Sequence, residues 1–186
     1  MMKPKYSGVV PVNEIWYDAE SQVELNLSVN VISHTFADGR GVIRLSIKVK
    51  EVVSWLSKAP VTRVYLPDIV EEIDAFAFYQ CSELVTVNLP DSLKRIGHIA
   101  FFMCRNLAIT ELPANISEIG DQSFIDCTSI PNLTIRRVEP PALGFAVFTG
   151  TTFPIYVPAE AVDTYKAASG WSDYASRIFA IPSNNS

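Results

Sequence analysis

A repeat of 23 residues runs through this chain and restricts what it can fold into. At that offset, five columns are identical in three successive copies. They are Leu66, Leu89 and Leu112; Pro67, Pro90 and Pro113; Ile73, Ile96 and Ile119; Phe78, Phe101 and Phe124; and Cys81, Cys104 and Cys127. A fixed period of this length is the signature of stacked repeats, none of which can bury its apolar groups alone. We therefore expect a solenoid whose coils share one core.

A fourth, eroded copy precedes these three. Ile43 falls on the leucine column and Trp55 on the phenylalanine column, whereas Lys58 stands where the cysteine would be. Terminal repeats of a stacked array are atypical because they have only one neighbour. The sequence thus predicts about four repeats of 23 residues, over residues 43–135.

Each repeat combines a strand with a turn. In residues 84–89 the apolar positions 84, 87 and 89 match the L-x-x-L-x-L strand signature of leucine-rich repeats. The proline that follows lacks an N–H and stops the strand. The later Ala-Phe-x-x-Cys segment predicts a helical or 3₁₀ turn that packs its Phe and Cys inward. The expected fold class is therefore an α/β solenoid.

The flanks show other patterns. Residues 13–42 alternate apolar and polar side chains, which is the period of a strand, and Asp38-Gly39 is a hairpin signal. The alternating apolar residues are Val23, Leu25, Leu27, Val29 and Val31. We expect a strand-rich N-terminal cap over residues 1–42. A last strand at 155–157 and a helix near 159–168 predict a helical C-terminal cap over residues 136–182, followed by a frayed tail, 183–186.

These segments resemble a known family. The unit "LPDSLKRIGHIAFFMCRNL", like "LPDIVEEIDAFAFYQCSEL" and "LPANISEIGDQSFIDCTSI", resembles the BspA-type leucine-rich repeat of host-associated anaerobic bacteria. The flanks "NEIWYDAE", "ISHTFADGRGVI" and "PIYVPAEAVDTYKAASGWSDYASRIFAI" resemble the caps of that family. The resemblance implies a right-handed curved solenoid used for adhesion or protein recognition, at the cell surface or secreted, and names no partner.

Charge and hydropathy restrict the class of partner. The chain has 15 Lys and Arg against 20 Asp and Glu, a net charge of −5, with no basic cluster, so we expect no nucleic acid partner. No apolar run approaches the roughly 20 residues of a membrane span, so we expect no membrane insertion. Residues 1–10 lack the apolar core of a signal peptide, so none is expected in this chain. The native compartment and the oligomeric state stay open, with a monomer favoured.

The cysteines are the most reactive side chains in the repeat. One cysteine per repeat, in register, predicts a buried ladder, whereas a nucleophile would occur once. Stacked strands lie about 4.8 Å apart, so a disulfide is geometrically conceivable. Three equivalent thiols cannot all pair, and we expect them to be reduced.

No pattern predicts catalysis, a metal or a cofactor. The only histidines, His34 and His98, lie far apart, and the cysteine spacing fits no zinc motif. Phosphate-binding, dinucleotide-binding and hydrolase motifs are absent. The pair Glu71-Glu72 is replaced by Lys94-Arg95 in the next repeat, which is typical of a solvated edge and not of an acid/base pair. We expect no enzyme, no cofactor and no metal site.

The candidate partner-binding residues are the variable strand positions that point away from the core. Two rows follow from the offset: Arg63, Thr86, Ile109 and Asn132, and then Tyr65, Asn88, Glu111 and Thr134. Curved solenoids present such a surface to partners, although the same residues also suit plain solvent-facing strands. The leading hypothesis is a non-enzymatic module that recognises a protein, less readily a glycan. The alternatives are a structural spacer or self-associating surface module without a specific ligand, and a small enzyme.

Overall fold

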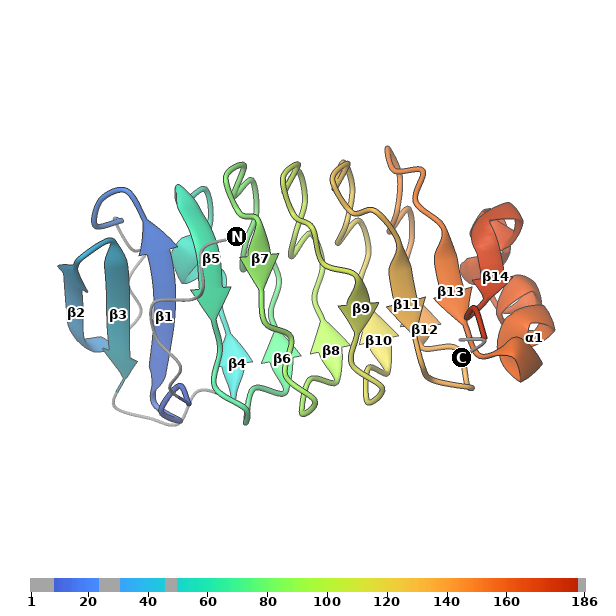
Figure 1. Ribbon diagram of the computed structural model, residues 1–186, viewed down its shortest axis with the longest axis horizontal. Coiled ribbons are helices and arrows are strands. Elements are labelled where there is room, and N and C mark those ends of the chain that lie inside the picture. Colours follow the sequence, from blue (N-terminus) through green and yellow to red (C-terminus); the bar gives the residue numbers. More distant parts are fainter. Residues whose placement is uncertain (1–8, 24–30, 46–49, 184–186) are drawn as a thin grey trace.

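The chain forms an elongated solenoid with two rows of strands along its length (Figure 1). The computed structural model describes residues 9–23, 31–45 and 50–183. The expected strand positions Leu25, Leu27 and Val29 lie outside these ranges. The repeat solenoid inferred from the 23-residue period is confirmed by the stacked parallel strands of both rows.

The front row of Figure 1 carries most of the strands. It comprises β1 (Glu14–Ala19), β2 (Val31–Ala37), β3 (Arg40–Leu45), β5 (Val61–Tyr65), β7 (Thr86–Val87), β9 (Glu111–Leu112), β11 (Leu133–Ile135), β13 (Ile155–Val157) and β14 (Ile178–Ala180). The second row comprises β4 (Glu51–Val52), β6 (Glu72–Ile73), β8 (Arg95–Ile96), β10 (Glu118–Ile119) and β12 (Ala142–Leu143). The helical segments are η1 (Ser54–Leu56), η2 (Ala159–Ala161), α1 (Val162–Ala167) and η3 (Trp171–Arg177).

The N-terminal strands pair differently from the repeats. β2 and β3 form an antiparallel hairpin, and β1 lies antiparallel between β3 and β5. The hairpin turn is Asp38-Gly39, where φ is 52° and 79°, as a two-residue type I′ turn requires. From β5 onward, every pairing within the two rows is parallel among the described residues.

The core is a stack of identical side chains. The rings of Phe78, Phe101, Phe124 and Phe148 lie face to face, with successive centroids 5.1, 5.2 and 5.9 Å apart. All four are fully buried. The isoleucine column of the second row is fully buried as well. Each coil thus buries its apolar groups against the next one, as the repeat requires.

The Ala-Phe-x-x-Cys segment forms turns, so the expected helical or 3₁₀ turn is wrong. Each of these turns contains two residues with positive φ, such as Ile99 at 58° and Met103 at 59°. Left-handed residues interrupt a helix. Alternate N–H groups of the turn bond across coils, as Phe78 N does to Ala100 O at 2.8 Å, and those between them bond within the turn, as Tyr79 N does to Phe76 O at 3.1 Å. Helix in the described residues is therefore confined to η1 and the C-terminal segments η2, α1 and η3.

A further coil follows residue 135, the expected end of the repeats. Here the offset grows to 24 residues, because Ala142 pairs with Glu118. Phe148 continues the ring stack, and Trp171 lies against it at 6.1 Å between centroids. Because one extra residue is inserted near Pro140-Pro141, the residues of this coil do not align with the earlier repeats at an offset of 23.

The second row brings backbones into direct contact at glycines. A Cβ placed on Gly120 would lie 2.7 Å from Gly97 C and 2.7 Å from His98 N. Gly120→Ala should therefore lower the free energy of unfolding by about 1–3 kcal/mol in a urea titration, because the coils must move apart. If the coils were not in close contact here, Gly120→Ala would instead raise the free energy of unfolding by about 0.4–1 kcal/mol, because alanine reduces the conformational entropy of the unfolded chain. The sign of the change decides between the two.

Candidate binding surface on the strand face

Alternate residues of the front row point away from the core. In β1, Ile15 and Tyr17 are fully buried, so Trp16 and Asp18 lie on the outer side. The register places Trp16 opposite Tyr65 and Asp18 opposite Arg63. We call these outer positions the strand face: Trp16, Asp18, Arg40, Arg63, Tyr65, Thr86, Asn88, Glu111, Asn132, Thr134, Tyr156 and Phe179.

Seven of the eight predicted positions lie on this face. Among them, Thr86, Asn88 and Glu111 are exposed. The other four, Arg63, Tyr65, Asn132 and Thr134, are partly exposed. The Asn88 amide is engaged in binding the neighbouring coil: Oδ1 accepts from Leu66 N at 2.6 Å and Nδ2 donates to Leu66 O at 2.9 Å.

Ile109 is the exception, since it is only 7% exposed and belongs to the core. The core column at this level reads Val64, Val87 and Leu133, but the third repeat has Thr110 in the same column. Thr110 is exposed in the structure. Burying the hydroxyl of Thr110 would require a hydrogen-bond partner, whereas burying Ile109 is favourable by about 2 kcal/mol. The backbone just before β9 therefore presents Ile109 inward and Thr110 outward, and the expected outward position of Ile109 is wrong.

This inversion coincides with a break in the front row. β7 is the last strand of one sheet, and β9 is the first strand of the next. At the break lies a hollow of about 500 Å³, which we call the central hollow. Its lining includes Thr86, Ile109, Thr110, Glu111 and Arg136. Arg136 Nε lies 2.6 Å from Glu111 Oε1, so a pair of opposite charges stands at its edge.

A second cluster on the strand face surrounds Arg40. Its guanidinium lies 3.0 Å from Asp18 Oδ1 and 4.6 Å from the centroid of the Tyr65 ring. The Tyr65 hydroxyl donates to Asp18 Oδ2 at 2.9 Å, and burial together with the Asp18 charge raises the pKa of Tyr65. Sequence reasoning missed Trp16, Asp18 and Arg40. The alternation in "EIWYDA" was the signal that could have placed the first two outward.

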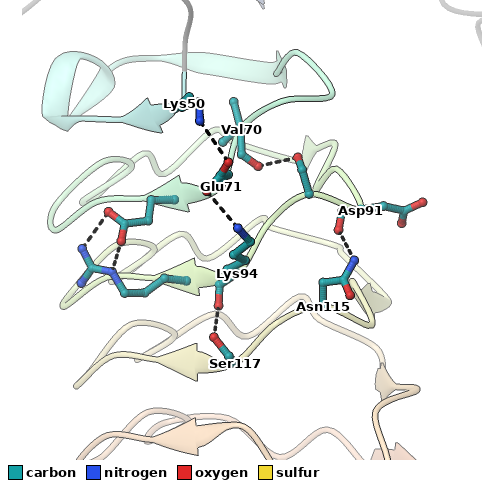
Figure 2. Close-up of polar contacts among 10 residues, drawn as sticks. Lys50, Val70, Glu71, Asp91, Lys94, Asn115 and Ser117 are labelled. Atoms are coloured by element: carbon teal, nitrogen blue, oxygen red, sulfur yellow. Dashed lines mark hydrogen bonds and ion pairs between the residues drawn. The ribbon is translucent and has the colours of Figure 1, made fainter.

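The charged edge between the two rows is a ladder of ion pairs (Figure 2). Glu71 lies between Lys50, at 3.3 Å, and Lys94, at 3.0 Å, and these lysines lower its pKa, Lys94 most. Arg95 contacts Glu72 at 2.5 Å and lowers the pKa of that carboxyl. A general acid near neutral pH needs a raised pKa. Glu71 and Glu72 therefore do not fit an acid/base pair. They form ion pairs with neighbouring coils at a partly exposed edge, and their alternation with Lys94-Arg95 predicted a solvated edge without predicting these contacts.

Further side chains of this edge bond to backbone carbonyls of the preceding coil. Figure 2 shows Asn115 Nδ2 donating to Asp91 O at 2.8 Å and Ser117 Oγ donating to Lys94 O at 3.1 Å. The carbonyl of Lys94 also accepts the backbone N–H of Ser117 at 2.8 Å, so the Ser117 hydroxyl adds to a backbone contact between the two coils. Asn115 and Ser117 are thus occupied by contacts within the solenoid.

The predicted ladder of buried free thiols is confirmed. Each Sγ donates to a carbonyl of the preceding coil: Cys81 to Leu56 O at 2.8 Å, Cys104 to Phe78 O at 3.0 Å, and Cys127 to Phe101 O at 3.1 Å. Burial raises the pKa of Cys81 and of Cys127 to about 12, and it raises the pKa of Cys104 as well. The thiols are therefore protonated at neutral pH and poor nucleophiles.

Thiol reactivity gives a direct check of this ladder. With a chromogenic aromatic disulfide as reagent, we expect no thiol to react in the native protein at neutral pH, and all three to react in denaturant. Rapid reaction of one thiol in the native state would contradict the ladder. The control is the same reagent with free cysteine in both buffers.

The described residues contain no group of three or more His, Cys, Asp or Glu side chains placed to hold a metal. In the same ranges, no helix has the length and apolar character needed to cross a bilayer.

Comparison with known proteins gives the following matches. A family model described as the BspA type leucine rich repeat region, in 6 copies, matches residues 54–151. No curated protein matches the chain. A leucine rich cell surface protein from Faecalibacterium prausnitzii is 22% identical, with a TM-score of 0.45, over 73% of this chain and 41% of that one. A leucine-rich repeat protein from Bacteroides ovatus is 21% identical, with a TM-score of 0.44, over 83% and 48%. The chain spans less than half the length of both.

Proposed function

The chain belongs to the BspA-type leucine-rich repeat family, and from this premise we propose that it is a non-enzymatic module that recognises a protein, less readily a glycan, through the strand face. The proposal includes a right-handed coil, a strand-rich cap over residues 1–42, repeats over residues 43–135, a helical cap over residues 136–182 and a tail over 183–186. The further coil after residue 135 precedes the helical segments of that cap. The partner is a host or cell-surface protein, and the module is a monomer.

The central hollow is the observation that carries this proposal. At about 500 Å³ it lies within the range of ligand sites, about 300–1,000 Å³, and it interrupts an otherwise continuous row of strands. Three of the predicted positions, Thr86, Ile109 and Glu111, line it. The other predicted positions, Arg63, Tyr65, Asn88, Asn132 and Thr134, extend the contact area along the face on either side.

The surroundings of the hollow suit protein recognition. Protein interfaces are enriched in aromatic residues and arginine. The strand face has Arg63 and Tyr65 on the strand next to the hollow, and it has Tyr156 and Phe179 on the last two strands of the front row. An enzyme would instead need an activated nucleophile or a carboxyl group with a raised pKa. The thiols are buried and protonated, and the pKa values of Glu71 and Glu72 are lowered.

A comparison of variants tests the strand face as the binding surface. Thr86→Arg places a long charged side chain in the central hollow, and Ala142→Arg places the same side chain on the exposed surface of the second row. We expect proteins retained by the immobilised wild type from host-cell surface extracts to be lost with Thr86→Arg, by about tenfold or more, and kept with Ala142→Arg. Tyr65→Ala and Arg63→Ala should each weaken retention.

The treatment of the extract separates the classes of partner. Loss of retained material after protease digestion identifies a protein, and loss after periodate oxidation identifies a glycan. Retention that is the same for all four variants would contradict recognition through the strand face and would favour the spacer.

A further inference from the structure

The hairpin at the N-terminal end carries a pocket of its own, apart from the central hollow. On the outer side of the hairpin, the register places Val42 opposite both Trp16 and Thr35, and it places Arg40 opposite Ala37. These five residues line a pocket of about 190 Å³. In Figure 1 the strands that carry them, β1, β3 and β2, lie side by side at the left end. We call it the hairpin pocket.

Buried charges fix the walls of this pocket. Arg40 is only 8% exposed, and its Nε and Nη2 each lie 3.0 Å from Asp18 Oδ1. The guanidinium also lies 5.5 Å from the centroid of the Trp16 ring. Trp16 Nε1 donates to Glu14 Oε2 at 2.7 Å, and Arg44 donates to the other carboxylate oxygen of Glu14 at 2.8 and 3.0 Å. The Trp16 ring is therefore held between Glu14 and the Arg40 guanidinium, and the guanidinium is itself held by Asp18.

Arg40 and Glu14 are buried, whereas their ion-pair partners Asp18 and Arg44 are 24% and 54% exposed. In some proteins such polar networks hold their side chains in one arrangement even where they add little stability. A binding site gains from such rigid walls, because little side-chain entropy is lost when the ligand enters. The network around Arg40, Asp18 and Glu14 has the properties expected of a preformed wall.

The chemistry of the lining indicates what enters. The charge of Arg40 is compensated by Asp18, so an anion would gain little there. The ring of Trp16 and the methyl groups of Ala37 and Val42 offer apolar contact. A volume of about 190 Å³ is below the range of about 300–1,000 Å³ that small-molecule sites occupy, and it suits one side chain.

We propose that the hairpin pocket binds one uncharged apolar side chain, of the size of leucine or phenylalanine, that a protein partner presents along the strand face. The preference for an apolar group follows from the pocket itself, whereas the assignment of this group to a protein rests on the proposed function. The pocket would then act as an anchor at one end of the contact area, with the central hollow further along the same face.

Fluorine NMR of the protein tests the pocket without a known partner. All three tryptophans are replaced by 5-fluorotryptophan, and the Trp16 signal is assigned with Trp16→Phe. We expect N-acetyl-leucinamide and N-acetyl-phenylalaninamide to shift this signal in a saturable manner, and N-acetyl-glycinamide, N-acetyl-aspartamide and methyl glucoside to leave it unchanged. Ala37→Leu and, separately, Thr35→Leu fill the pocket and should abolish the shift. The matched control Ala108→Leu, in the central hollow, should preserve it.

Three outcomes would overturn the proposal: no shift with either apolar probe, an equal shift with the aspartate or glucose derivative, or a shift that survives both filling variants. The retention assay described above separates failure of the hairpin-pocket proposal from failure of the proposed function. If retention is lost with Thr86→Arg but unchanged with Ala37→Leu, the proposed function is supported and the role of the hairpin pocket as an anchor is contradicted. Probe binding at Trp16 with no retention by the wild type would support the pocket and contradict the proposed function.

Discussion

Replacing Phe101 with alanine should lower the free energy of unfolding by about 3–5 kcal/mol. Phe101 is fully buried and stacks on Phe78 and Phe124, with centroids 5.1 and 5.2 Å away. Alanine would leave a cavity in the middle of the stack, and coils held by fixed turns cannot close it. Denaturant titration measures the change as a shift of the midpoint.

The matched control for this variant is Phe145→Ala. Phe145 is 76% exposed, so its loss should change the free energy of unfolding by no more than about 0.5 kcal/mol. Should Phe101→Ala fall within about 1 kcal/mol of the wild type, the ring stack would not be the core of the solenoid.

Alkaline pH should weaken the fold through the thiol ladder, by about 4 kcal/mol at about pH 9.5. Cysteine in the unfolded chain has a pKa of about 8.5, whereas the pKa values of Cys81 and Cys127 are raised to about 12 and that of Cys104 is raised as well. Above about pH 8.5 the unfolded chain releases protons that the folded chain keeps, so stability falls as pH rises, up to about pH 12. Each thiol accounts for about 1.4 kcal/mol at about pH 9.5.

The control is a variant with serine at all three cysteine positions. A serine hydroxyl does not titrate in this range and keeps a donor near the same carbonyls. Urea titrations between about pH 8 and about pH 9.5 stay below the ordinary pKa values of tyrosine and lysine. The wild type should lose stability over this interval and the serine variant should stay nearly constant. Equal slopes for both proteins would exclude the thiols as the cause.

The repeat period predicted the stack of coils because identical residues at a fixed offset must meet in a solenoid. Phe101, Cys104 and Ile96 are buried as expected. The conformation of the turn was not predictable in this way, since residues such as Ile99 and Met103 do not ordinarily favour positive φ. Contacts between coils impose that conformation, and they are not encoded in local sequence.

The candidate surface was predictable only in part. The offset placed Thr86 and Glu111 on the outer side, but it treated every repeat alike and so missed the exchange of Ile109 and Thr110. Both exchanged residues line the central hollow, so the offset could not predict it. Likewise, Arg40 is distant in sequence from Tyr65, and only the antiparallel strands β3 and β1 bring the two side chains together.

The bonds between coils have a consequence for length. Phe78 N donates forward to Ala100 O, while Cys104 Sγ donates backward to Phe78 O, and the same two bonds recur at the next junction, from Phe101 N to Ser123 O and from Cys127 Sγ to Phe101 O. A gene segment encoding one whole coil could be duplicated or removed without leaving a junction of a new kind. Each such step would move the hairpin pocket and the C-terminal end of the strand face apart, or together, by about 4.8 Å. The spacing between distant contact points could thus evolve in fixed increments of one coil, while the residues at each contact point stay the same.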